Sequence, residues 1–171
     1  MIPTALILSL AVPVIGAATP NAASADSSYR YESVSAISLD TSVIRIDIAN
    51  KVLVYPATLT ELEACPGKRN RCFKTTRMSF CSPTELEIRA GAWNCGDDDL
   101  GFHVTGERTL HIIGNDIHTL VISSHGTEYF FNRERGLVMF RFIGQPITEV
   151  YWSTSPLGFG SINQEAELRP D

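Results

Sequence analysis

The residues with the most defined chemistry in the sequence are four cysteines: Cys65, Cys72, Cys81 and Cys95. Cysteine thiolates bind zinc or join as disulfides, and the spacing of the pairs separates these two chemistries. Six residues lie between the first two cysteines and thirteen between the last two, whereas paired zinc ligands are separated by roughly two to four. We therefore expect two disulfides and no bound metal or cofactor. Sequential pairing, Cys65–Cys72 and Cys81–Cys95, is favoured because it closes two compact loops, and the other connectivities stay open.

A run of positive charge follows the first cysteine. Five basic residues and no acidic residue lie between Cys65 and Thr84, in a chain whose formal net charge is −5. This segregation creates a local positive potential that attracts an acidic partner. The predicted partner-binding residues, which we call the basic stretch, are Lys68, Arg69, Arg71, Lys74 and Arg77. The alternative is a solvated disulfide loop whose charges bind nothing.

Four histidines lie in one strand-rich region: His103, His111, His118 and His125. A two-residue turn at Gly114-Asn115 would place His111 opposite His118, close enough for both rings to bind one metal ion. A turn at Asn115-Asp116 would instead place His111 opposite Leu120. His111 and His118 are therefore weak metal candidates, and partly exposed histidines without a ligand are the stronger expectation.

No motif in the sequence defines a catalytic centre. The run Asp97 to Asp99 lacks the alternating acidic positions of an EF-hand, so a solvated turn is preferred to a calcium site. Ser124 and His125 are adjacent, and adjacent strand residues face opposite sides, so they do not form a nucleophile–base couple. We assign no catalytic residue. A small metal-dependent or hydrolytic enzyme using His111 and His118 is the alternative function.

The elements that must position these residues are mostly short strands. Residues 42–48 alternate between two faces, with Ile44 and Ile46 on one of them, and a turn at Asn50-Lys51 leads into a second strand over 52–55. From Leu100 onward, strand-like segments alternate with turn residues. We expect hairpin turns at Gly114-Asn115, of type II′, and at His125-Gly126, of type I′.

One or two short helices are also expected. Residues 57–64 contain a capping-box pattern that favours one or two helical turns. The second helix follows Ser82-Pro83-Thr84-Glu85, in which Ser82 caps the helix, Pro83 begins it and Glu85 bonds back to the cap, with Gly91 at the end. Residues 137–143 carry apolar side chains on both faces, as in a strand buried on two sides. The sequence therefore predicts an all-β fold, an antiparallel sandwich or small barrel with one or two short helices.

The first residues resemble a targeting segment rather than part of this fold. An apolar segment shorter than a membrane span precedes Ala23-Ser24-Ala25, which matches the A-x-A pattern of signal-peptide cleavage. We expect residues 1–25 to be a signal peptide, and 26–171 a single β-rich exported domain without a transmembrane segment. The location is then secreted or periplasmic. The alternative is an apolar N-terminal strand.

Composition limits the classes of partner. The net charge of −5 argues against a nucleic-acid binder, which usually carries a strongly basic domain. We expect a non-enzymatic binding domain whose partner is an acidic protein or an anionic envelope polymer. A further alternative is a β-barrel carrier of an apolar ligand, lined by the aromatic residues concentrated late in the chain.

Overall fold

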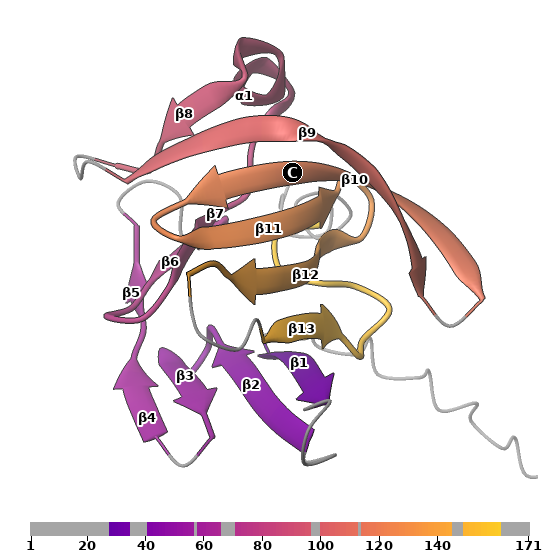
Figure 1. Ribbon diagram of the computed structural model, residues 1–171. Coiled ribbons are helices and arrows are strands. Elements are labelled where there is room, and N and C mark those ends of the chain that lie inside the picture. The colour runs from indigo at the N-terminus through magenta and orange to yellow at the C-terminus, as the bar shows by residue number, and fades with distance from the viewer. Residues whose placement is uncertain are drawn as a thin grey trace, which may run out of the picture.

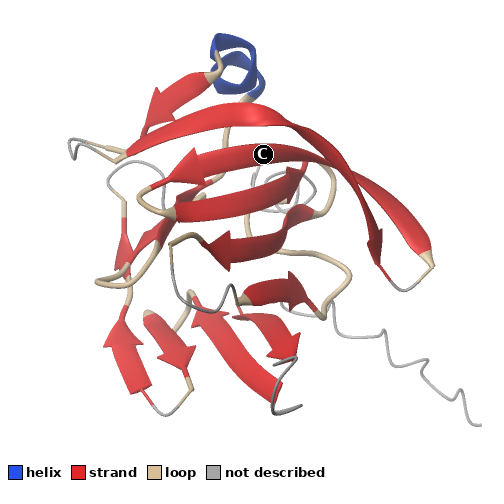
Figure 2. Cartoon of the chain, viewed as in Figure 1, coloured by secondary structure: helices blue, strands red, loops and turns tan. Residues whose placement is uncertain are grey.

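The computed structural model describes residues 28–34, 41–56, 58–65, 71–96, 100–112, 114–144 and 149–161. The predicted signal peptide, the segment 66–70 with Lys68 and Arg69, and the run Asp97 to Asp99 lie outside the described residues. Strands dominate the described part of the chain, which contains one helix (Figure 2). The elements in chain order are β1 Ser28–Val34, β2 Thr41–Asp47, β3 Val52–Tyr55, β4 Thr58–Glu61, β5 Glu63–Ala64, β6 Cys72–Lys74, β7 Ser79–Cys81, α1 Glu85–Ala90, β8 Ala92–Asn94, β9 Gly101–Ile112, β10 Asn115–Ser124, β11 Thr127–Asn132, β12 Gly136–Phe142 and β13 Val150–Ser153.

Ten strands form one large antiparallel sheet in the order β4-β3-β2-β1-β13-β12-β11-β10-β9-β8. The sheet is strongly twisted, and its β9–β10 hairpin extends beyond the neighbouring strands (Figure 1). The N-terminal strand β1 lies in the middle of the sheet, between β2 and β13. Strands β5, β6 and β7 form a second, smaller sheet. The predicted fold class, mainly antiparallel β with a short helix and disulfides, is confirmed.

The alternating pattern of residues 42–48 produces the expected strand. Ile44 and Ile46 on β2 are fully buried, whereas Arg45 between them is exposed. The predicted hairpin is also present, since β2 pairs with β3 and Asp47 faces Val52 across the turn. Alternation of this kind buries one face of each strand and leaves the other face polar.

The small sheet packs against the large one through aromatic side chains. Phe73 on β6 and Phe80 on β7 face each other in register, and both are fully buried. The Phe80 ring centroid lies 4.9 Å from that of Tyr129 on β11 and 6.3 Å from that of Phe102 on β9. The two sheets therefore share one aromatic core.

A segment after β13 completes this core. The Phe159 ring centroid lies 5.0 Å from that of Phe73 and 5.4 Å from that of Tyr29 on β1. Tyr31 fixes the segment, because its buried hydroxyl donates to the Leu137 carbonyl at 3.0 Å and accepts from the Phe159 N–H at 3.1 Å. The main chain at Phe159 is thus held against β1, which carries Tyr31, and β12, which carries Leu137.

The helix predictions are half confirmed. Within the predicted helical segment, Thr58–Glu61 forms β4 and Glu63–Ala64 forms β5, because β4 pairs along its whole length with β3 and leaves Leu59 exposed at the sheet edge. Helix α1 is present and ends at Gly91. Its N-cap, however, is Thr84, paired with Glu87, and not Ser82. Ser82 instead donates its hydroxyl to the Gly160 carbonyl at 3.0 Å.

One of the two predicted hairpin turns is correct. His125 and Gly126 both have positive φ, 43° and 74°, and Ser124 pairs with Thr127, as a type I′ turn requires. The turn predicted at Gly114-Asn115 is wrong. Asn115 pairs with Ile112 and so belongs to strand β10. This difference changes which residues face each other along the whole hairpin.

Gly160 gives a test of the packing between the C-terminal segment and the small sheet. Its φ is +74°, and an added Cβ would lie 2.5 Å from Cβ of Ser82. Gly114 has the same φ of +74°, but nothing lies within 4 Å of its added Cβ. Gly114→Ala should cost about 1–2 kcal/mol through backbone strain alone. Gly160→Ala should cost about 1–3 kcal/mol more, because overpacking adds to the strain.

Urea unfolding of the two single variants measures both effects. Equal losses of stability in the two variants would show that Ser82 moves aside freely and that the contact with Gly160 does not constrain the fold.

Candidate functional site

Both predicted disulfides are present. Cys65 pairs with Cys72 and Cys81 with Cys95, with Cα atoms 5.5 Å and 6.2 Å apart. All four cysteines are buried. The first bond joins the residue after β5 to the first residue of β6, within the small sheet, and the second joins the last residue of β7 to the residue after β8. They hold the β6–β7 hairpin, which carries part of the basic stretch.

Strand alternation divides the β6–β7 hairpin into two faces. Phe73 and Phe80 form the face that enters the core, and so Lys74 and Ser79, the next pair in register, belong to the opposite face. Residues 75–78 form the turn, which Thr75 stabilises by donating its hydroxyl to the Met78 carbonyl at 2.8 Å and accepting from the Met78 N–H. The hairpin therefore presents Lys74 and Arg77 beside a well-ordered turn.

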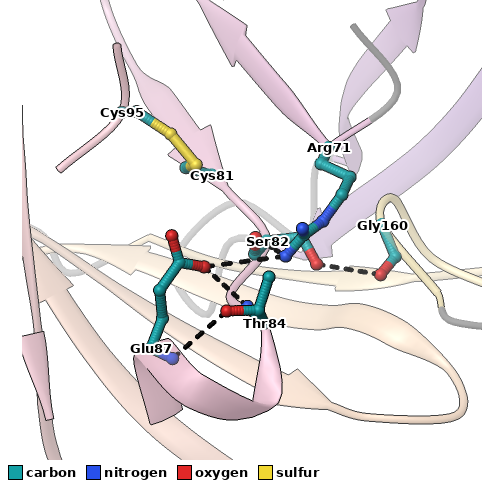
Figure 3. A network of polar contacts seen from close by, with 7 residues as sticks. All are labelled: Arg71, Cys81, Ser82, Thr84, Glu87, Cys95 and Gly160. Carbon is teal, nitrogen blue, oxygen red and sulfur yellow. Dashed lines mark hydrogen bonds and ion pairs between the residues drawn. A yellow bond between two sulfur atoms is a disulfide. The ribbon is translucent and has the colours of Figure 1, made fainter. Parts of the chain in front are cut away.

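Arg71 has a structural role within the basic stretch. Its Nη2 donates to the Ser82 carbonyl at 2.7 Å and lies 3.7 Å from Oε2 of Glu87 (Figure 3). The same Glu87 oxygen accepts from the Thr84 N–H at 2.7 Å. Arg71 thus connects the first disulfide loop to the start of helix α1, and its side chain is only 20% exposed. Its contacts point into the protein rather than toward a partner.

A cleft of about 220 Å³, which we call the basic cleft, lies between the β6–β7 turn and the β10–β11 turn. Its floor is formed by buried side chains, among them Met78, Thr127 and Tyr129. The described lining residues are Lys74, Thr75, Thr76, Arg77, Met78, Ser79, Leu100, Ser124, His125, Thr127 and Tyr129. Two residues of the basic stretch are therefore brought together with parts of the chain some 50 residues further on.

The charge of the basic cleft is one-sided. Lys74, Arg77 and His125 line it, and no described lining residue is acidic. The Arg77 guanidinium lies 4.8 Å from the ring centroid of Tyr55 on β3, a cation–π contact that orients the side chain. The His125 ring is positioned by a contact of 3.0 Å between its Nδ1 and the Ser124 hydroxyl. This contact corrects the expectation that the adjacent residues Ser124 and His125 face opposite sides, because His125 lies in the turn after β10 and has a positive φ of 43°. Such a lining favours an anionic group.

Tyr129 connects the two walls of the basic cleft. Its hydroxyl donates to the Ser79 carbonyl at 2.6 Å, which joins β11 to β7. Burial raises the pKa of Tyr129 well above the ordinary tyrosine value, so the phenol stays neutral and remains a donor. Neither Tyr129 nor His125 was identified from the sequence as part of this site. Tyr129 and Ser79 are 50 residues apart in sequence, and no local sequence pattern indicates their contact.

The histidine prediction is corrected by the register of β9 and β10. His111 faces Asp116, and its Nδ1 contacts that carboxylate, whereas His118 faces Thr109 with 2.9 Å between its Nδ1 and the hydroxyl. The two rings are therefore not directly opposite each other. His118 lines a groove of about 640 Å³ in which acidic and basic side chains alternate. The charged residues of this mixed groove are Glu107, Arg108, Asp116, Arg133, Glu134 and Arg135.

The late aromatic residues fill the protein interior. Tyr129, Phe131 and Phe140 are almost completely buried in the core that both sheets share. Phe140 stacks on Tyr151 with ring centroids 5.3 Å apart. These side chains pack against each other, which disfavours the alternative of a carrier whose aromatic residues line an internal cavity.

Comparison with known proteins adds no assignment. No family model matches the chain, and neither a curated protein nor a solved structure matches it significantly. Among the described residues, no helix has the length and apolar character needed to cross a membrane. The function must therefore be inferred from the site itself.

Tyr129→Phe tests the connection between the cleft walls. The variant leaves the part-buried Ser79 carbonyl without its donor, which should lower the free energy of unfolding by about 1–3 kcal/mol at neutral pH. In the unfolded chain Tyr129 ionises near pH 10, but in the folded protein its raised pKa keeps it neutral. Stability should therefore fall as the pH rises above about 10, and less steeply in the variant.

Urea unfolding between neutral and strongly alkaline pH measures both effects. An alkaline loss of stability that is the same in wild type and Tyr129→Phe would show that Tyr129 is not held neutral by the fold.

Proposed function

We propose that this protein is a non-enzymatic binding domain that holds an anionic group of its partner in the basic cleft. The observation that carries this proposal is that Lys74, Arg77 and His125 line the basic cleft and that no acidic residue is among its described lining residues; Glu63 on β5, which faces Lys74 in register, lies outside that lining. The mixed groove is larger, but its acidic residues offset its arginines. A chain of net charge −5 that gathers cations at one cleft is suited to selective attraction of acidic groups.

The size of the basic cleft supports recognition of one group at a time. Its volume of about 220 Å³ is below the roughly 300–1,000 Å³ of pockets that enclose a small molecule. It suits a carboxylate side chain of an acidic protein, or one charged repeat of an anionic envelope polymer. Further contacts would come from the surface around the basic cleft. Lys68 and Arg69 are candidates for such contacts, because they lie a few residues before Lys74 in the sequence.

Charge reversal of Lys74→Glu with Arg77→Glu tests the proposal. Two probes represent the two partner classes, poly-glutamate for an acidic protein and polyphosphate for an anionic polymer. The double variant should lose about tenfold or more in affinity at low salt, because attraction becomes repulsion. The difference should shrink as the ionic strength rises. Fluorescence anisotropy of labelled probes over a salt series measures both effects.

A matched control is Arg45→Glu with Arg89→Glu. It changes the net charge equally, and both residues are exposed and line neither the basic cleft nor the mixed groove. Equal loss of affinity in the two double variants would show that the overall charge accounts for the effect, and would contradict a specific site. A third variant, Lys68→Glu with Arg69→Glu, reports whether the first disulfide loop contributes to the contact.

We also infer that the protein is exported and is secreted or periplasmic. Support comes from the two buried disulfides, which persist in oxidising compartments, and from the apolar segment before Ala25. N-terminal sequencing of the protein recovered after export should give a mature chain that begins at Asp26. Recovery of a chain that still contains residues 1–25 from an exporting host would contradict a cleaved signal peptide.

A further inference from the structure

A pocket of about 310 Å³, which we call the aliphatic pocket, lies beyond the end of strand β11. β11 pairs with β10 only from Leu120 to Ser124, so residues 115–119 continue past it as part of the extended β9–β10 hairpin (Figure 1). This hairpin forms one side of the pocket. The start of β12 and the segment 153–158 after β13 form the other sides. The pocket shares no described lining residue with the basic cleft.

The side formed by the segment after β13 is held by main-chain contacts. The Gly158 N–H donates to the Arg135 carbonyl at 2.6 Å, and the Leu137 N–H donates to the Phe159 carbonyl at 2.9 Å. A Cβ added at Gly158 would overlap the Leu137 carbonyl oxygen, so only glycine allows this close approach. On the other side, the Arg135 N–H donates to Oδ1 of Asn132 at 2.8 Å. The main chain at Arg135 is thus fixed relative to the pocket.

The floor of the aliphatic pocket is apolar. Ile117 and Val138 line it and are each 6% exposed, yet neither belongs to the aromatic core that the two sheets share. Val138 follows Leu137, which does belong to that core, so strand alternation places Val138 on the opposite face of β12. The half-buried Ile112 and the exposed Pro156 add further apolar surface. Such a floor favours contact with an alkyl chain.

The described lining of the aliphatic pocket contains one charged residue, Arg135. It is exposed, and no ion pair joins it to an acidic residue in the described part of the chain. Asp116 and Glu134 line the adjoining mixed groove but not this pocket. A guanidinium offers a planar fork of N–H donors that matches a carboxylate. One cation beside an apolar floor therefore suits a ligand with a single negative charge and an alkyl chain.

We propose that the aliphatic pocket binds a monocarboxylate of the class of medium-chain fatty acids. Arg135 holds the carboxylate, and the alkyl chain lies on Ile117 and Val138. The volume of about 310 Å³ is at the lower end of the roughly 300–1,000 Å³ of small-molecule pockets, which limits the ligand to a short chain. This binding is independent of the anionic partner of the basic cleft, because the two sites share no described lining residue.

Methyl NMR of the full chain labelled at isoleucine and valine tests the site. The probes are octanoate, 1-octanol, which has the chain without the charge, and acetate, which has the charge without the chain. We expect saturable shift changes with octanoate at the methyl groups of Ile112, Ile117 and Val138. Ile44 and Ile46, which are fully buried in the core, should not shift and serve as internal references. Acetate should not saturate these changes in the same concentration range.

Arg135→Gln tests the role of the cation. The wild-type protein should bind octanoate about fivefold or more tighter than 1-octanol, because the acid alone makes a charge-assisted hydrogen bond at this partly exposed site. In Arg135→Gln the two affinities should become about equal, because this bond is lost. Arg133→Gln is the matched control, since it removes the same charge from the same turn but Arg133 does not line the pocket. It should keep the wild-type ratio.

Three results would overturn the proposal. The first is the absence of saturable octanoate shifts at the three pocket residues in the wild-type protein. The second is an unchanged ratio of octanoate to 1-octanol affinity in Arg135→Gln. The third is an equal fall of this ratio in Arg133→Gln, which would show that the net charge of the turn, and not a contact with Arg135, attracts the acid.

Discussion

The large sheet encloses an aromatic core that its own side chains do not fill. The Phe73–Phe80 pair of the small sheet completes that core. These two rings contact aromatic side chains from β9, β11 and the segment after β13. Because side chains alternate along a strand, the burial of Phe73 determines that Lys74 belongs to the opposite face. The position of the cationic turn thus follows from the packing of the core.

The small sheet depends on crosslinks as well as on this packing. Its strands contain only two or three residues each, and an isolated hairpin of that length is not stable in water. One disulfide crosslinks the residue after β5 to β6 within the small sheet, and the other joins β7 to the residue after β8. The Tyr129–Ser79 hydrogen bond joins the small sheet to β11, and Arg71 joins the first disulfide loop to helix α1. The walls of the basic cleft come from both sheets, so the same contacts that stabilise the small sheet also determine the shape of the cleft.

The sequence predicted the features that depend on neighbouring residues. The strand at Ile44 and Ile46, the type I′ turn at His125-Gly126 and both disulfides have local signatures of alternation, turn chemistry and spacing. Residues 57–64 were mispredicted as helical because pairing with β3 overrides a local capping pattern. The position of one turn decided which residues face His111, and a sequence pattern does not determine a turn to within one residue. The basic cleft was not predictable, since its walls are far apart in the chain.

The central claim is that the basic cleft, and not the mixed groove, holds the anionic group. The most direct measurement is an NMR titration of the ¹⁵N-labelled protein with a hexaglutamate peptide. We expect saturable shift changes at the amides of Lys74 to Ser79 and of Ser124 to Tyr129, on both walls of the cleft. Changes concentrated at Glu107 to His118, or no saturable changes at the cleft, would contradict it.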